Sequence, residues 1–171
     1  MNINYKIIDQ NTKDLSSLDK VCKLMDKINE ANQAPHLYPP DRQFFIKTLS
    51  EGNLTVLAFD EDELVGYLVV KFLKKWPGYF NKTPDINPEE TTMFLFMIVD
   101  QEYRGKNISS TMNNLALKQI KISGKRFAIS TAHPENTGSI KSLEKLGMSE
   151  LYQDEIFEEK LLRSIMFMEI S

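Results

Sequence analysis

From Met93 to Ser110 the chain reads MFLFMIVDQEYRGKNISS. The first part is an apolar run typical of a buried strand, and the last part begins an amphipathic helix. Between them lies a short basic turn that contains Arg104, Gly105 and Lys106. A helix N-terminus carries free backbone N–H groups and the positive end of the helix dipole, so this junction predicts an anion site. We expect the bound group to be a phosphate.

The overall composition is that of an ordinary globular protein. The chain has 171 residues, of which 42% are hydrophobic and 26% are charged, and no change in composition divides it, so we expect one domain over residues 1–171. The formal net charge of −3 argues against nucleic acid as a partner, because such binders need a dominant basic surface. No apolar stretch is long enough to cross a bilayer, so we expect no membrane partner.

The cysteine content indicates whether disulfides or metal sites are expected, and the first ten residues indicate where the protein is located. Cys22 is the one cysteine, which excludes an internal disulfide and offers no cluster of metal ligands, so we expect no metal. It lies at helical spacing among Leu18, Val21, Met25 and Ile28 and is expected to be a buried core thiol. The opening residues MNINYKIIDQ lack the basic-then-apolar pattern of a secretory signal, so a cytoplasmic location is expected.

Hydrophobic periodicity predicts an alternation of strands and helices. Strands are expected at residues 3–9, 53–60, 63–75, 92–99, 126–131, 148–154 and 164–170, and helices at 15–32, 41–49, 107–123 and 137–147. The helix at 107–123 is expected to bury Ile108, Met112, Leu115 and Ile122. Residues 76–90 form a long loop, and 155–163 are ambiguous. These elements predict an α+β fold with a mixed, mostly antiparallel central sheet and helices on both faces.

The segment YRGKNIS, the later Asn136 and the run EKLGM at 144–148 together resemble the GNAT superfamily of N-acetyltransferases. The pyrophosphate motif of that family has Arg or Gln, two residues, Gly, one residue, then Gly or Ala. Arg104 matches its first position, and the two small positions fall on Asn107 and Ser109. Neither is glycine, but asparagine tolerates positive φ far better than a β-branched residue does. The resemblance covers about residues 53–151 and implies the acyl-CoA N-acyltransferase fold.

The resemblance implies acetyl-CoA as co-substrate and identifies residues that would hold it. The backbone of the central strand would hydrogen-bond the pantetheine arm, and the turn and the helix start would hold the diphosphate. The family also has an asparagine at the start of the next helix. The residues so identified are Met97, Ile98, Val99, Arg104, Gly105, Lys106, Asn107, Ile108, Ser109, Ser110 and Asn136.

The catalytic groups are less evident, because Leu143 stands where the family has a tyrosine acid. Two residues are candidates for proton transfer: His133, just past a strand end that faces the acyl group in this fold, and Glu90, before the central strand. The alternative for His133 is a loop histidine without a catalytic part. Tyr103 and Tyr152 could replace the missing phenol or be ordinary residues at the edge of the core.

The acceptor site is expected where two loops border it in this fold. Aromatic and acidic residues there suit a cation with an apolar body, namely the amine of a small molecule or a peptide. The alternative is that the aromatic residues only pin the long loop to the core. The residues assigned to the acceptor are His36, Tyr38, Trp76, Tyr79, Phe80 and Glu89.

The sequence therefore predicts an acetyl-CoA-dependent N-acetyltransferase in which an amine attacks the thioester directly in a ternary complex. One alternative is a catalytically silent acyl-CoA-binding sensor or partner module of the same fold. Another is an unrelated α+β binding domain. The resemblance leaves a homodimer open.

Overall fold

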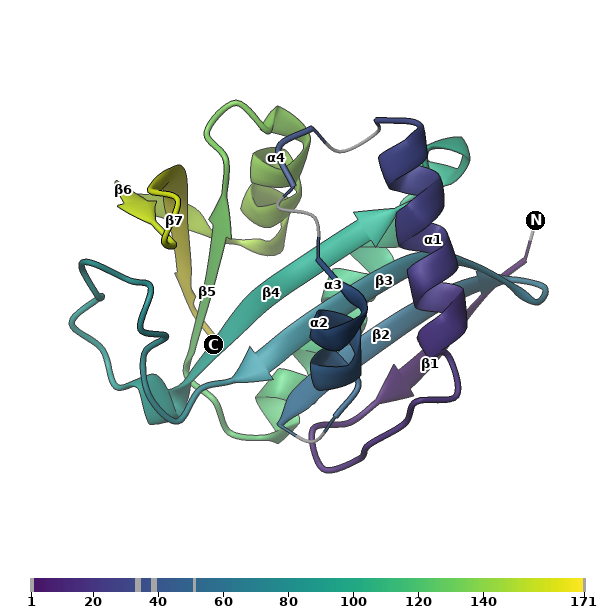
Figure 1. Ribbon diagram of the computed structural model, residues 1–171. Coiled ribbons are helices and arrows are strands. Elements are labelled where there is room, and N and C mark those ends of the chain that lie inside the picture. The colour runs from purple at the N-terminus through teal and green to yellow at the C-terminus, as the bar shows by residue number, and fades with distance from the viewer. Residues whose placement is uncertain (1, 33–34, 38–39, 51, 171) are drawn as a thin grey trace.

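The computed structural model describes residues 2–32, 35–37, 40–50 and 52–170, and within them seven strands form one sheet (Figure 1). Their order across the sheet is β1-β2-β3-β4-β5-β7-β6. Of the six neighbouring pairs in this part of the chain, β4 and β5 are parallel and the others antiparallel. The mostly antiparallel mixed sheet is confirmed. The strands are β1 (Ile3–Ile8), β2 (Asn53–Asp60), β3 (Glu63–Phe72), β4 (Thr91–Val99), β5 (Phe127–Ala132), β6 (Ser149–Ile156) and β7 (Leu161–Glu169).

Helices cover both faces of the sheet, as expected for the predicted fold class. On one face lie α1 (Leu18–Glu30) and α2 (Arg42–Thr48), and on the other lie α3 (Ile108–Ile122) and α4 (Thr137–Leu146) (Figure 1). Two single-turn helices, η1 (Pro88–Glu90) and η2 (Gln101–Tyr103), lie just before and just after β4. No helix in the described ranges has the length and apolar character needed to cross a bilayer.

The ambiguous segment 155–163 is a β-hairpin. Strand β6 continues to Ile156 and β7 begins at Leu161, so four residues form the turn. Phe157 and Lys160 both have positive φ, of 69° and 52°. Neither is a residue type that favours this conformation, so the sequence gives no sign of the turn. Strand β3 also ends at Phe72, three residues before the predicted 75.

The buried face of α3 differs from the predicted one. Ile108, Met112, Ala116 and Ile120 are buried at a spacing of four residues, whereas Ile122 is 79% exposed. A helix turns through roughly 100° per residue, so Ile122 lies on the side away from Ile120. The prediction for Ile122 is wrong, because an apolar side chain at a helix end is not always part of the stripe.

Cys22 lies at the edge of the core between α1, α2 and the sheet. It is half-buried and packs against that cluster, and Nη1 of Arg42 lies 3.7 Å from its sulfur. The predicted buried thiol is therefore corrected to a partly accessible one at the edge of this core.

Candidate active site

Strands β4 and β5 pair along only part of their length. Their pairing runs from Thr91 opposite Phe127 to Phe94 opposite Ser130, and the Ser130 hydroxyl donates to the Phe94 carbonyl at 2.9 Å. Beyond this point the strands part (Figure 1). The other edge of β4 stays paired with β3 as far as Val99. The edge of 95–99 that faces β5 therefore presents backbone groups that a ligand can pair with.

A β-bulge marks the point where the two strands separate. Val70 pairs with Phe94 and Val69 pairs with Phe96, so Leu95 is an extra residue in β4. Bulges turn the backbone locally and often lie next to active sites. Sequence reasoning missed Leu95, because a bulge inside a continuous apolar run leaves no signal in the hydrophobic pattern.

The turn before α3 leaves the first amides of the helix without a capping side chain. Asn107 is the N-cap residue and has left-handed geometry, with φ of 61°, and its side chain makes no capping hydrogen bond. Asparagine tolerates this conformation, which supports the match of Asn107 to a small position of the motif. The backbone N–H groups of Ile108, Ser109 and Ser110 precede the first bond of the helix, which Thr111 donates to the Asn107 carbonyl. This helix start lies at the end of β4 where the strands have parted, so an anion could bind there.

The basic side chains of this turn have partners in the structure. Nε of Arg104 donates to the carbonyl of Val99 at 3.3 Å. Nζ of Lys106 lies 4.7 Å from the centre of the Tyr103 ring, and the Tyr103 hydroxyl donates to Asp60 at 3.0 Å. Lys106 thus borders an acidic cleft of about 770 Å³ beside the β2–β3 hairpin. Tyr103 is directed to this hairpin and away from the predicted role of acid.

A buried ion pair fixes the end of β4 to α1. Asp100 is fully buried, and its carboxylate accepts from Nζ of Lys27 at 2.6 Å. Lys27 also contacts Glu102 at 3.0 Å, and hydrogen bonds to Asp100 and Glu102 raise the pKa of Lys27 above its ordinary value. The turn that precedes α3 is therefore held from behind by a charged contact to another helix.

The start of α4 is capped by a side chain. Oδ1 of Asn136 accepts from the backbone N–H of Ser139 at 3.1 Å. Asn136 was assigned to the cofactor, and in this structure its oxygen caps α4. Gly147, with φ of 106°, ends the helix as predicted. Leu143, on α4, is buried in the core and carries no hydroxyl. The hydroxyl of Tyr152 already donates to the Lys82 carbonyl at 2.6 Å.

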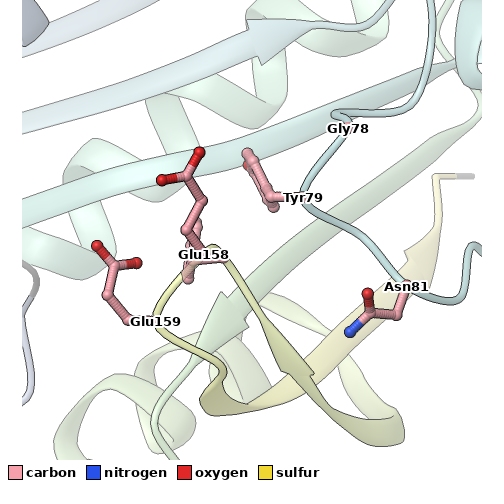
Figure 2. Close-up of a pocket in the computed structure, with 6 residues that line it drawn as sticks. Gly78, Tyr79, Asn81, Glu158 and Glu159 are labelled. Carbon is pink, nitrogen blue, oxygen red and sulfur yellow. The ribbon is translucent and has the colours of Figure 1, made fainter.

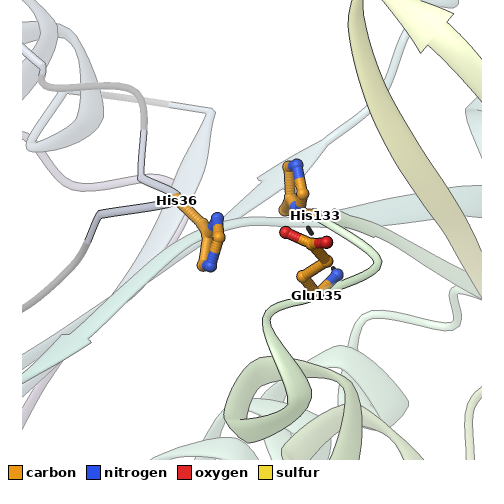
Figure 3. A group of neighbouring side chains, drawn as sticks. All are labelled: His36, His133 and Glu135. Atoms are coloured by element: carbon orange, nitrogen blue, oxygen red, sulfur yellow. Dashed lines mark hydrogen bonds between the residues drawn. The ribbon is translucent and has the colours of Figure 1, made fainter.

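The two histidines meet at the end of β5 (Figure 3). Their rings are stacked, with centres 4.5 Å apart. The backbone N–H of Glu135 donates to Nδ1 of His133 at 3.1 Å. This bond occupies the Nδ1 lone pair and places the proton of a neutral ring on Nε2. His133 was predicted as a base; here its ring presents an N–H donor instead of a free lone pair.

Arg163 holds the segment that carries His36. This β7 residue is only 6% exposed, and its guanidinium donates to the carbonyls of Leu162 at 3.2 Å and His36 at 3.4 Å. Burial lowers the pKa of Arg163 below its ordinary value. The connection between α1 and α2 is thereby tied to the sheet beside the β4–β5 opening.

Glu89 and Glu90 lie at the other end of β4. Glu90 forms an ion pair with Arg126 at 3.1 Å, and the Glu89 carbonyl accepts from Lys125. Strand β4 has nine residues, so roughly 25–30 Å separates them from the turn before α3. The structure therefore does not bring Glu90 together with His133, and it places Glu89 away from the acceptor side. Both residues precede β4, whereas His133 follows β5, so the strand lengths keep them apart. Their roles in proton transfer and acceptor binding stay predictions.

The aromatic residues of the long loop have two different roles. Phe80 is buried, and Trp76 packs beside it with the ring centres 6.0 Å apart, so these two pin the loop to the core. Tyr79 instead lines an open cleft of about 550 Å³ (Figure 2), and burial raises the pKa of its hydroxyl to about 12. Tyr38 lies outside the described residues. The other residues lining the cleft are Gly78, Asn81, Phe157, Glu158 and Glu159.

Glu158 and Glu159 were not identified from the sequence. They lie in the β6–β7 turn, across the cleft from Tyr79 (Figure 2). The sequence left the structure of residues 155–163 ambiguous, so it could not show which part of the surface these two carboxylates face. The cleft therefore combines an aromatic wall with two carboxylates, which suits an ammonium group.

The model of the Acetyltransferase (GNAT) family matches residues 18–148. No curated protein matches the sequence. Three solved structures illustrate the similarity of fold. The ribosomal-protein-S18-alanine N-acetyltransferase of Escherichia coli has a TM-score of 0.73 and 11% identity, with 99% of this chain and 95% of that chain covered.

Two further similar structures contain the coenzyme. YncA of Salmonella typhimurium with its cofactor acetyl-CoA has a TM-score of 0.70 and 13% identity, with 100% of this chain and 95% of that chain covered. The PaiA N-acetyltransferase of Thermoplasma acidophilum in complex with coenzyme A has a TM-score of 0.71 and 14% identity, with 99% of each chain covered.

Proposed function

The chain belongs to the GNAT acetyltransferase family, and we propose that it transfers an acetyl group from acetyl-CoA to a primary amine of a small molecule or peptide. The observation that carries this proposal is the separation of β4 from β5 beside the uncapped start of α3. A phosphate-bearing ligand with a long amide-containing arm fits such a combination, because it can use helix amides at one end and a strand edge at the other.

The cofactor would lie across these two features. The diphosphate would accept from the amides of Ile108, Ser109 and Ser110, with Arg104 supplying positive charge nearby. The pantetheine arm would pair with the open edge of 95–99. The bulge at Leu95 would turn a backbone N–H toward the thioester carbonyl, which stabilises the developing oxyanion.

The acceptor would reach the thioester from the aromatic and acidic cleft. Glu158 and Glu159 would attract its ammonium group, and Tyr79 would pack against its apolar part. An alkylamine with a pKa of about 10.4 costs about 4.6 kcal/mol to deprotonate at pH 7. We propose that water in the cleft carries this proton away toward Glu158, because Nδ1 of His133 is already engaged.

The neutral His133 ring would act as a hydrogen-bond donor through Nε2. Attack of the neutral amine forms a C–N bond, and the C–S bond breaks as the tetrahedral intermediate collapses. The nitrogen would then lose a proton to solvent, and the departing thiolate would take one up. This mechanism needs no phenol at Leu143, and it predicts a modest rate, since general acid catalysis contributes about 10²-fold or more where it is present.

A second function, binding of acyl-CoA without turnover, is favoured by one observation. Leu143 is buried in the core at the position where the family has its proton donor. A protein of this shape could therefore sense acyl-CoA or present it to a partner.

Calorimetry and a thiol-release assay separate these two functions. We expect coenzyme A and acetyl-CoA to bind, and a panel of mono-, di- and polyamines and peptides to release free thiol above the rate without amine. Binding with no thiol release from any amine would favour the silent binder. Absence of binding at millimolar coenzyme A would contradict both functions.

A further inference from the structure

The two histidines of the sequence and Glu135 form a cluster between distant segments. One ligand atom from each of His36, His133 and Glu135 lies within 4.8 Å of the others. We propose that these residues bind a divalent transition metal, with Zn²⁺ as the reference ion, and so tie the α1–α2 connection to the turn before α4.

The donor set has the right chemistry for such an ion. Two imidazoles and a carboxylate are a common zinc ligand set, and they leave a fourth position for water. In a tetrahedral site the donor atoms are roughly 3.3 Å apart, so the three side chains must close by about an ångström or a little more. Figure 3 shows the His36 and His133 rings face to face with the Glu135 carboxylate beside them, so both rings must rotate out of this stack to direct a nitrogen at one ion. The exposed Glu135 and the half-buried histidines can make this movement through side-chain rotation.

Metal binding changes one hydrogen bond in a defined way. Nδ1 of His133 accepts from the Glu135 amide. If Nδ1 binds the metal, its lone pair is no longer available to this amide. If Nε2 binds instead, the proton moves to Nδ1, which can no longer accept. In either case the Glu135 N–H loses His133 as its acceptor, which gives a signature that is specific to this site.

The charges around the cluster set its affinity. Glu135 supplies the negative charge, and the guanidinium of Arg163 contacts the carbonyl of His36. A cation so close weakens the binding of a second one. We therefore expect reversible binding in the micromolar range, below the affinity of closed structural zinc sites.

The cluster lies at the end of β5, beside the point where β5 separates from β4. His36 belongs to the segment that Arg163 ties to the sheet, and His133 directly follows β5. A metal bridge would hold this segment in place beside the opening. Zinc should therefore slow acetyl transfer; this consequence alone rests on the proposed function, whereas the metal site does not.

The test uses untagged, uniformly ¹⁵N-labelled protein. Because the sequence has two histidines, a long-range ¹H–¹⁵N spectrum reports the ligating nitrogen of each ring. On titration with Zn²⁺ we expect both rings and the Glu135 amide to shift together at one equivalent. Cobalt(II) should give the visible absorption of a tetrahedral site, and Zn²⁺ should abolish it.

Three variants and one control complete the experiment. His36→Asn, His133→Asn and Glu135→Gln should each weaken Zn²⁺ binding at least tenfold, while Glu144→Gln, the same change on the exposed side of α4, should leave it unaltered. Circular dichroism shows whether each variant is folded. The proposal is overturned if neither ring shifts at a tenfold excess of Zn²⁺, or if folded His36→Asn protein binds Zn²⁺ as tightly as the parent.

Discussion

Helices α3 and α4 lie on the same face of the sheet, and an asparagine stands at the N-cap of each, but the two starts are built in opposite ways. Asn136 uses its side chain to accept the Ser139 N–H. Asn107 uses its backbone, which adopts φ of 61°, and its side chain caps nothing. In α4 the N-cap side chain accepts a hydrogen bond from a first-turn amide, whereas in α3 the first-turn amides stay available to a ligand.

The turns before these helices are also held differently. The turn before α3 is fixed by the buried carboxylate of Asp100 and the ammonium of Lys27. In the turn before α4, neutral hydrogen bonds join His133 to Asn136 and to Glu135. The start of α3, which its own N-cap side chain does not cap, is thus supported from outside the helix.

The largest effect is expected from Lys27→Met. It removes the cationic partner of the buried Asp100, which would cost about 3–5 kcal/mol in a fully buried pair. Lys27 is 40% exposed on its side chain, so water reduces the loss to about 2 kcal/mol. Thermal unfolding should begin about 4–8 °C lower. Lys23→Met, an exposed lysine on the same helix, is the control, and equal melting temperatures of the two variants would refute the anchoring role.

Asn107→Val is expected to reduce coenzyme A affinity more than tenfold. A β-branched residue in left-handed geometry costs about 1–2 kcal/mol, so the turn would change shape and move the helix amides. Isothermal titration calorimetry measures the loss. Asn107→Gly tolerates the same φ and should bind nearly as well as the parent, so equal weakening in both variants would show that the side chain matters and not the backbone.

Asn136→Ala should destabilise the protein and leave binding almost unchanged. Loss of the cap costs about 1 kcal/mol, or about 2–4 °C in melting temperature, while coenzyme A affinity should fall less than threefold. Asn136→Ser restores a capping oxygen and should recover most of the stability. A tenfold loss of affinity in the alanine variant would instead support the cofactor role predicted from the sequence.

An exposed ion pair away from both helices gives the smallest effect. A hydrogen bond from Lys6 is the main cause that lowers the pKa of Asp14 to about 2. A lowered folded-state pKa means that the contribution is present above about pH 4 and is lost as pH falls toward 2. Asp14→Asn should cost about 0.5 kcal/mol at pH 7 and less at pH 2, where part of the Asp14 carboxylate is protonated in the folded protein. Urea unfolding at both pH values measures this, and an equal cost at pH 2 would contradict the ion-pair account.

Much of the fold follows from local patterns. The apolar runs at 53–60 and 63–75 predicted strands β2 and β3, and the pattern at 137–147 predicted α4. Ile122 shows the limit, because it lies on the side of α3 away from the buried Ile120. The hairpin turn at Phe157 could not be predicted, since phenylalanine does not favour the positive φ found there.

The turn before α3 was more predictable from the sequence than the cleft beside Tyr79. An asparagine at position 107 tolerates the left-handed conformation, and this signal is local in sequence. The cleft between Tyr79 and Glu158 and the meeting of His36 with His133 depend on how distant segments pack. The separation of β4 from β5 was also not predicted, because an apolar strand has the same sequence pattern whether or not its edge is paired with another strand.

The separation of β4 from β5 also connects ligand binding with folding. A ligand that binds there in the folded protein finds no such site in the unfolded chain, so its binding raises the free energy of unfolding. At a hundred times the dissociation constant this gain is about 2.7 kcal/mol. If the proposed function holds, the lifetime of the protein against proteolysis would follow the supply of coenzyme.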